Sequence, residues 1–194
     1  MVVLHRKEKL VFTAIDVLNE FGIQGLSTKE IAKRQGISEA AIFKHFSTKN
    51  ELVLAMLNHY SQYDSDIIVS SRERKNNPLE AIQYFIKAYA EYYENYPAIT
   101  VITQAYDVLA GNQELADKIK DIFKTRSDFV MELVEEAKRQ GRLIPNTDPE
   151  KLADMITGAF NTICLKWRLK QYGFSLKEYT LETLKMLLNA FFKY

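Results

Sequence analysis

The sequence has 194 residues, of which 47% are hydrophobic and 26% charged, a composition typical of a globular rather than a disordered protein. Its single cysteine, Cys164, excludes an intramolecular disulfide and favours a reducing, cytoplasmic location. The net charge is only +1, and no uninterrupted apolar run approaches the roughly 18 residues that a membrane span requires.

The positive charge is concentrated near the start of the chain. Residues 1–52 hold eight Lys and Arg against six Asp and Glu, a net charge of +2, whereas the rest of the chain carries −1. Residues 27–49 alone carry +3. The excess is modest, but it lies on one short segment, as expected of a surface that meets phosphate groups.

Helical periodicity begins early in the chain. Val11, Ile15, Leu18 and Phe21 recur at intervals of three or four residues and predict one apolar face of a helix. Gly22 then predicts the end of that helix, because glycine is frequent just past a helix C-terminus.

Three helix starts follow within 22 residues. Ser27 and Thr48 are each followed three residues later by glutamate, the pattern of a capping box, and Ser38 is an N-cap between them. The resulting helices, at about 28–35, about 39–46 and from about 48, must be short.

The segment between these caps has the spacing of a helix-turn-helix. Ala32 supplies a small residue, Gly36 a turn glycine, and Ile37 and Ile42 two apolar side chains that can plug the angle between the helices. Such a motif places its second helix in the major groove of DNA. We therefore expect the helix at about 39–46 to enter the groove and the helix at about 28–35 to cross the backbone.

The expected DNA contacts divide into two groups. Ala40 can touch a thymine methyl, Lys44 can reach guanine or a phosphate, and Glu39 can accept from cytosine N4 but would be repelled by misplaced phosphates. His45 either faces the groove or packs on the neighbouring Phe46. The full candidate set is Thr28, Lys29, Ser38, Glu39, Ala40, Lys44, His45 and Lys49, with phosphate contacts expected at Thr28, Lys29 and Lys49.

The rest of the chain also predicts helices, and no segment shows the period-two alternation of a strand. Starts are predicted at Asn77-Pro78, Asp148-Pro149 and Ser175, an interruption at Pro97, and a long helix from near Glu114 to Gly141. The sequence thus predicts an all-α fold of about nine helices.

The body is rich in tyrosine. Aromatic side chains at helical spacing are more often core than binding site, but buried tyrosine hydroxyls need partners, so some of these rings are candidates to line a cavity. Arg126 lies within an apolar stripe, where it either pairs with an acid such as Asp107 or anchors a carboxylate or phosphate of a ligand. The candidate ligand-binding residues are Phe85, Tyr89, Tyr92, Tyr93, Tyr106, Arg126, Phe160 and Asn161.

The last two helices carry long apolar stripes. Asn161 and Thr162 face either a subunit interface or the pocket. Cys164 is expected to be a small core residue, because no neighbour in the sequence favours its thiolate; a redox-sensing thiol is the alternative.

The residues of the head resemble a known family. The run Gly36-Ile37-Ser38, then Ile42 to Phe46, then Thr48 to Leu52 is similar to the tetracycline-repressor (TetR) family of bacterial regulators over about the first 55 residues. The resemblance implies a DNA-binding domain at 1–52, with the helix from about 48 as a link, and a ligand-binding and dimerisation domain at 53–194. It places Phe43 where the family usually has a phosphate-binding tyrosine, so Phe43 is left out of the contacts.

The function expected from this resemblance is a repressor. A homodimer paired through its last two helices binds a palindromic operator in double-stranded DNA, and a small hydrophobic or amphipathic effector releases it. The alternatives are a DNA-binding regulator whose body only dimerises or recruits a partner, and, more remotely, an all-α enzyme. No cofactor, metal or membrane association is expected, since His5, His45 and His59 lack metal-ligand spacing and no nucleotide-binding motif is present.

Overall fold

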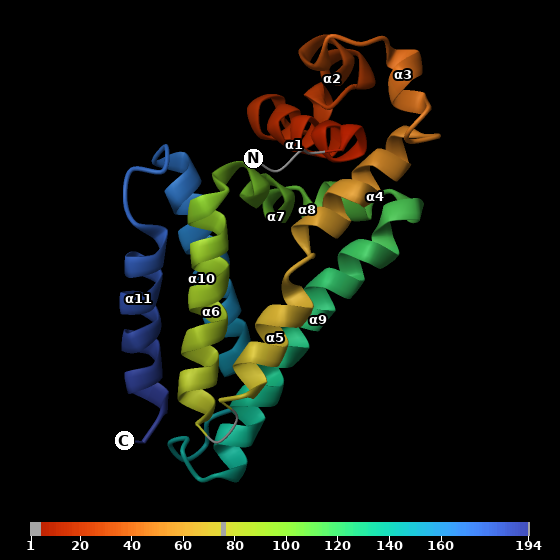
Figure 1. The fold of residues 1–194 in the computed structure, drawn as a ribbon. Coiled ribbons are helices and arrows are strands. Elements are labelled where there is room, and N and C mark those ends of the chain that lie inside the picture. The colour runs from red at the N-terminus through yellow and green to blue at the C-terminus, as the bar shows by residue number, and fades with distance from the viewer. Residues whose placement is uncertain (1–4, 75–76, 194) are drawn as a thin grey trace. The chain divides into compact units, whose positions relative to one another are not determined.

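The computed structural model describes residues 5–74 and 77–193, which form an all-α fold (Figure 1). Its helices are α1 (Arg6–Gly25), α2 (Thr28–Gln35), α3 (Glu39–Phe43), α4 (Lys49–Tyr60), α5 (Asp64–Arg72), α6 (Pro78–Asn95), η1 (Pro97–Thr100), α7 (Val101–Gln104), α8 (Tyr106–Ala110), α9 (Gln113–Arg139), α10 (Pro149–Leu169) and α11 (Leu176–Phe191). The expected all-α fold of about nine helices is confirmed, since α7 and α8 are only four and five residues long. In the described ranges the only β pairing is one antiparallel bridge between Leu143 and Phe192.

The chain divides into two compact units. Unit 1 combines the chain up to residue 62 with residues 98–122, and unit 2 combines residues 63–97 with those from 123 onward. The last of the three points at which the chain passes between the units, between residues 122 and 123, falls inside α9. No helix within the described residues is both long and apolar enough to cross a membrane.

In unit 1, α1 is the central helix of the N-terminal head, and it packs against α2 and α4. Leu10, Ile15 and Leu18 are at most 1% exposed and form the floor of this core. Burying such a side chain contributes about 1.5–3 kcal/mol. Phe21 departs from the prediction: it is 54% exposed, and its ring lies under the guanidinium of Arg34, with 5.3 Å between the Arg34 Cζ and the ring centroid.

The predicted N-caps of the head are confirmed. The Oγ of Ser27 accepts from the Glu30 N–H at 3.2 Å, and the Oγ1 of Thr48 accepts from the Glu51 N–H at 3.1 Å. Ser38 caps α3 in the same way. Each cap satisfies a backbone donor that the first turn of a helix leaves unpaired.

Gly22 interrupts α1 rather than ending it. Its φ of 67° and ψ of −173° are non-helical, as glycine permits, and one further turn extends to Gly25. The prediction of a break at Gly22 is therefore correct in position, but the chain resumes a helical turn after it.

Unit 2 is a bundle in which α6 packs against α5 and α11, and α11 packs against α10. The predicted starts at Pro78 and Pro149 and the end of α6 before Pro97 are confirmed. Asp148 caps α10 by accepting from two backbone N–H groups. Asn77 instead donates its side-chain amide to Glu80 at 2.6 Å.

Candidate DNA-binding interface and ligand-binding residues

The turn between α2 and α3 is built around Gly36. Gly36 lies in the left-handed region at φ 62°, which glycine adopts without the penalty that a Cβ would bring. Its N–H donates to the Lys33 carbonyl at 3.2 Å, and the Ile37 N–H donates to the Ala32 carbonyl at 3.0 Å. Ala32 and Ile42 are both buried. These contacts fix the exit of the chain from α2 and so give α3 a defined direction, as a helix-turn-helix requires.

The groove helix is shorter than expected. α3 ends at Phe43, whereas the sequence predicted a helix to about residue 46. The N–H groups of His45 and Phe46 both donate to the Ile42 carbonyl, at 2.8 and 3.0 Å. Residues 44 and 45 form a turn, and Thr48 is already extended as the N-cap of α4. Lys44 and His45 therefore lie immediately beyond α3.

Most of the candidate DNA contacts lie at the surface of the head. Lys29, Ser38, Glu39, Ala40, Lys44, His45 and Lys49 are exposed, and Thr28 is half-buried. Thr28 and Lys49 are the first residues of α2 and α4. In the described part of the chain no carboxylate forms an ion pair with Lys29, Lys44 or Lys49. These three ammonium groups are thus available to an anion.

Two of the candidates contact each other. The hydroxyl of Thr28 donates to Oε2 of Glu39 at 2.6 Å, which joins the first residue of α2 to the first residue of α3. A phosphate that accepted a bond from Thr28 would have to displace this carboxylate. Glu39 therefore holds the ends of both helices together in the absence of DNA.

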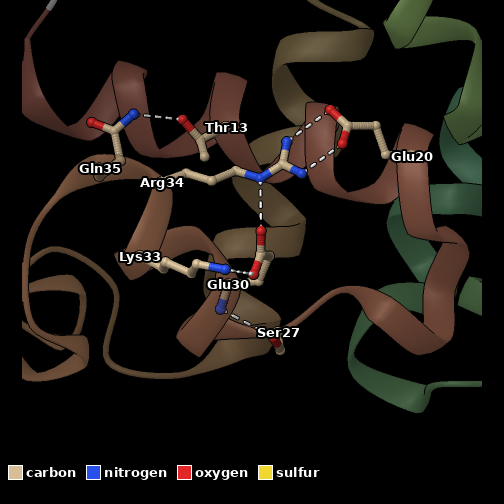
Figure 2. A network of polar contacts seen from close by, with 7 residues as sticks. All are labelled: Thr13, Glu20, Ser27, Glu30, Lys33, Arg34 and Gln35. Carbon is tan, nitrogen blue, oxygen red and sulfur yellow. Dashed lines mark hydrogen bonds and ion pairs between the residues drawn. The ribbon is translucent and has the colours of Figure 1, made fainter.

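Arg34 is engaged by two carboxylates, as Figure 2 shows. Its Nη1 and Nη2 donate to the two oxygens of Glu20 at 2.8 and 2.6 Å, and its Nε donates to Glu30 at 3.0 Å. These bonds raise the pKa of Arg34 and lower that of Glu20. The +3 charge of residues 27–49 thus overstates the positive surface, because Arg34 is neutralised by Glu20 from outside that segment. The Glu30–Arg34 spacing of four residues was a visible signal, but nothing local marked Glu20 as a partner.

His45 is exposed on the surface next to the end of α3. The group that lies over the ring of Phe46 is the ammonium of Lys7, 5.0 Å from the ring centroid. The position of His45 is therefore compatible with the groove-facing alternative.

In unit 2, Arg126 is held by Asp64. Its Nε and Nη2 donate to the two carboxylate oxygens at 3.0 and 2.8 Å, and the two side chains are only 14% and 8% exposed. The pairing of Arg126 with an acid, one of the two alternatives, is therefore confirmed, but the example Asp107 is wrong: it lies exposed on α8. The sequence does not indicate Asp64 as the partner, because Asp64 is 62 residues away and lies in the first turn of a helix, where acidic residues are common.

Two tyrosines complete this ion pair. Tyr89 donates its hydroxyl to Asp64 at 2.8 Å, and Arg126 donates to the Tyr93 hydroxyl at 3.0 Å. The guanidinium also stacks over the Tyr89 ring, 4.5 Å from its centroid. These contacts give the buried hydroxyls partners within the protein, which the tyrosine-rich core needs whether or not it holds a ligand.

Six of the eight candidate ligand residues come together around this pair. Tyr93 stacks on Phe160 with 5.8 Å between centroids and lies 5.7 Å from Tyr92, and Phe85 lies 4.9 Å from Tyr89. We call Phe85, Tyr89, Tyr92, Tyr93, Arg126 and Phe160 the tyrosine cluster.

The other two candidates lie elsewhere. Tyr106 belongs to unit 1, where its ring lies 6.1 Å from that of Tyr60. Asn161 is exposed on α10, as is Thr162, so neither points into the core beside Phe160.

A surface hollow of about 320 Å³ adjoins the cluster at Tyr92. It is lined by the aromatic rings of Tyr63, Tyr84 and Tyr92 and by Asp66 and Glu91, among others. It is open to solvent, so it is a surface feature rather than an enclosed cavity.

Comparison with known proteins decides the family. A model of the tetR family of bacterial regulatory proteins matches residues 10–56, and a model of the C-terminal region of YsiA-like proteins matches residues 58–190. The chain belongs to the tetR family. TetR-family regulators bind DNA operators as dimers and respond to small-molecule effectors.

Individual relatives are distant. The nucleoid occlusion factor SlmA of Haemophilus ducreyi is 25% identical over 122 residues, which cover 62% of this chain and 60% of that protein. The ketosteroid transcriptional regulator KstR2 of Mycobacterium tuberculosis has a similar fold, with a TM-score of 0.85 and 21% identity over 100% of this chain and 98% of that one. FadR of Bacillus subtilis, in complex with stearoyl-CoA, gives a TM-score of 0.75 and 18% identity over 94% and 97% of the two chains.

The family assignment and the geometry of the head agree. This TetR-family chain is a DNA-binding transcriptional regulator whose helix-turn-helix comprises α2 and α3. Within the described residues no group of three or more His, Cys, Asp or Glu side chains could hold a metal ion.

Proposed function

We propose that this TetR-family protein is a repressor that binds a palindromic operator as a dimer and is released by a small effector. The proposal divides the chain into a DNA-binding domain at 1–52 and a ligand-binding and dimerisation domain at 53–194, with α4 linking them. We propose further that the protein acts in the cytoplasm, where its DNA target lies, and that it has no catalytic role.

The observation that carries the proposal is the charge of the helix-turn-helix surface. Lys29, Lys44 and Lys49 are exposed, and no carboxylate neutralises them in the described structure. Lys49, at the start of α4, can bind phosphate together with the unpaired N–H groups of that helix end. Lys44 lies close enough to α3 to reach either a base edge or a phosphate.

Sequence reading in the groove is assigned to the exposed residues around α3. Ser38 and Ala40 present a hydroxyl and a methyl group, while Lys44 and His45 supply the longer hydrogen-bond donors. Because these donors are few, the shape and deformability of the operator contribute to recognition. Thr28 and Lys29 position the head on the backbone.

Dimerisation is proposed through α10 and α11. These helices carry apolar side chains that one subunit leaves in solvent: Met155, Leu165, Leu169, Tyr179 and Met186 are between 38% and 74% exposed. Two such helices and their copies can form a four-helix bundle. Asn161 and Thr162, exposed on α10, belong with this surface rather than with a pocket.

The effector is proposed to be hydrophobic or amphipathic and to bind at the tyrosine cluster. The aromatic rings that line the hollow at Tyr92 support this, and so does the stearoyl-CoA complex of the structurally similar FadR. The ion pair with Asp64 makes Arg126 a structural residue first. An anionic group that binds Arg126 must compete with Asp64 for its donors.

The alternative is a regulator whose body only dimerises or recruits a partner. The mutual hydrogen bonds of Asp64, Tyr89, Tyr93 and Arg126 favour it, because this part of the core needs no ligand to satisfy its polar groups. Thermal unfolding in the presence of a metabolite library separates the two: a ligand that binds only the folded protein raises the Tm. A library that contains acyl-CoAs, fatty acids and aromatic compounds and shifts the Tm in no case would favour the alternative.

The repressor itself is tested by footprinting. DNA fragments upstream of the gene that encodes this chain, and of its neighbours, should show a protected palindrome whose half-sites lie about 34–36 Å apart or a multiple of that distance. Protection throughout a genomic fragment library, without a preferred site, would overturn the proposal.

A further inference from the structure

Arg34 is the most heavily bonded cation of the head. It lies in the last turn of α2, and its guanidinium donates to both oxygens of Glu20 on α1 and to Glu30 on α2 (Figure 2). Its guanidinium carbon lies over the ring of Phe21, and the next residue, Gln35, donates to the Thr13 hydroxyl at 2.7 Å. The last turn of α2 is thereby tied to α1 at two adjacent residues.

This arrangement argues against a phosphate contact at Arg34. Glu30 also pairs with the ammonium of Lys33 at 4.0 Å, so two cations and two carboxylates balance and the network offers an anion no net positive charge. A bidentate carboxylate pair also uses the fork of donors that a phosphate would need. The nearby Asp16, whose pKa is raised mainly by burial and further by Glu20, adds another acidic group.

The position of Arg34 in the chain gives it a different role. Gly36, which begins the turn, follows Arg34 and Gln35 directly, so any rotation of the end of α2 changes the direction in which α3 leaves the turn. The Lys33 and Ala32 carbonyls, which accept the two bonds of the turn, lie in that same final turn. The bonds that fix Arg34 against α1 therefore also fix the direction of α3.

We propose that Arg34, through Glu20 and Glu30, is a positioning residue for sequence-specific DNA binding and not a DNA contact. This inference rests on the proposed operator binding. It predicts that the ion pair of Arg34 with Glu20 affects affinity for the operator but does not affect the non-specific attraction between the head and DNA.

The substitution Glu20→Gln tests this, because the two roles predict opposite signs. If Arg34 positions α2, Glu20→Gln should weaken binding to the footprinted operator about tenfold, with binding to random-sequence DNA and the salt dependence unchanged. If Arg34 is instead a phosphate contact restrained by Glu20, the same substitution should tighten binding to both DNAs and steepen the salt slope by about one unit. That second outcome would overturn the proposal, as would an unchanged operator affinity.

Arg34→Lys adds a second measurement. It keeps the charge but loses the fork, so a positioning residue should lose the ratio of operator to random-sequence affinity, whereas a phosphate contact should be largely preserved. Asp117→Asn is the matched control, since it removes one negative charge from an exposed position on α9 in the same unit. All variants are compared by circular dichroism at a temperature where each is folded, so that a stability effect alone cannot move the ratio. If the protein binds no operator, the proposed repressor function is refuted. If it binds an operator with an affinity that Glu20→Gln and Arg34→Lys leave unchanged, this inference alone is refuted.

Discussion

At the scale of single residues, the structure separates cations that can meet DNA from cations that hold the fold. Lys49 and Arg34 are only 15 positions apart and looked equivalent in the charge pattern of the sequence. Lys49 starts a helix without an acidic partner in the described structure, whereas Arg34 is bound by two carboxylates. The spacing of four residues indicated Glu30 as one partner, but Glu20, a residue of another helix, is marked by no local pattern.

The prediction for Lys49 concerns salt dependence. Lys49→Ala should reduce the slope of log affinity against log salt by about one unit while preserving the preference for the operator, because a phosphate contact releases about one counterion and reads no sequence. Fluorescence anisotropy at several salt concentrations measures this, with Lys120→Ala on α9 as the control. A change in sequence preference would show that Lys49 contacts a base.

The prediction for Arg126 concerns stability. Arg126→Met leaves the buried Asp64 carboxylate without its cation and should lower the free energy of unfolding by about 3–5 kcal/mol. The double variant Asp64→Leu, Arg126→Met removes both charges and should recover much of that loss, because replacing a buried pair by apolar side chains is often close to neutral.

Urea unfolding of the single and double variants gives both numbers. If Arg126→Met is as stable as the parent chain but no longer responds to an effector, the residue is a ligand anchor and the structural role is refuted.

At the scale of elements, the sequence predicted helix starts better than contacts. Ser27, Ser38, Thr48 and Asp148 all cap as expected, since a cap is a local bond between a side chain and the next turn. The length of α3 was overestimated because periodicity does not show the turn at Lys44 and His45 that leads to the extended N-cap Thr48. The tyrosine cluster and the Asp64 partner depend on packing between helices far apart in sequence, which periodicity does not specify.

The contact between α1 and α4 contains a titratable group. His59 of α4 packs edge-on against Phe12 of α1, with 4.7 Å between ring centroids, and both line a hollow with Lys7 and Glu8. Burial lowers the pKa of His59 below its ordinary value of 6.5, although Glu8 acts in the opposite direction.

This lowered pKa sets the sign of a pH effect. As the pH falls below about 6.5, the unfolded chain takes up a proton at His59 before the folded chain does, so the free energy of unfolding should decrease. His59→Phe should reduce that decrease between pH 7 and pH 5, relative to His45→Phe, which changes an exposed histidine. Unfolding curves across this range that are equally steep in pH for the parent chain and His59→Phe would contradict the prediction.

At the scale of the whole molecule, the proposed pairing of two subunits through α10 and α11 brings two DNA-binding heads together. A single head has few long donors, and so useful affinity requires two heads on one operator.

Cys164 lies on the buried side of α10, where burial raises the pKa of its thiol to about 12, so the thiol remains protonated and is poorly placed to act as a redox switch.

The exposed apolar side chains of α10 and α11 should be required for DNA binding, because they are proposed to hold the dimer together. Leu169 and Met186 are each 74% exposed in one subunit, so Leu169→Asp with Met186→Asp should change the stability of the isolated subunit little. In a dimer the same charges would be buried against a copy of themselves, and the dimer should dissociate into monomers. Analytical ultracentrifugation measures the state, and operator binding should fall with it by at least a hundredfold, since each head then binds a half-site alone. Val69→Asp, which charges an apolar position on α5 that is 55% exposed, is the control and should remain dimeric. A double variant that stays dimeric and keeps its operator would place the interface elsewhere on the molecule.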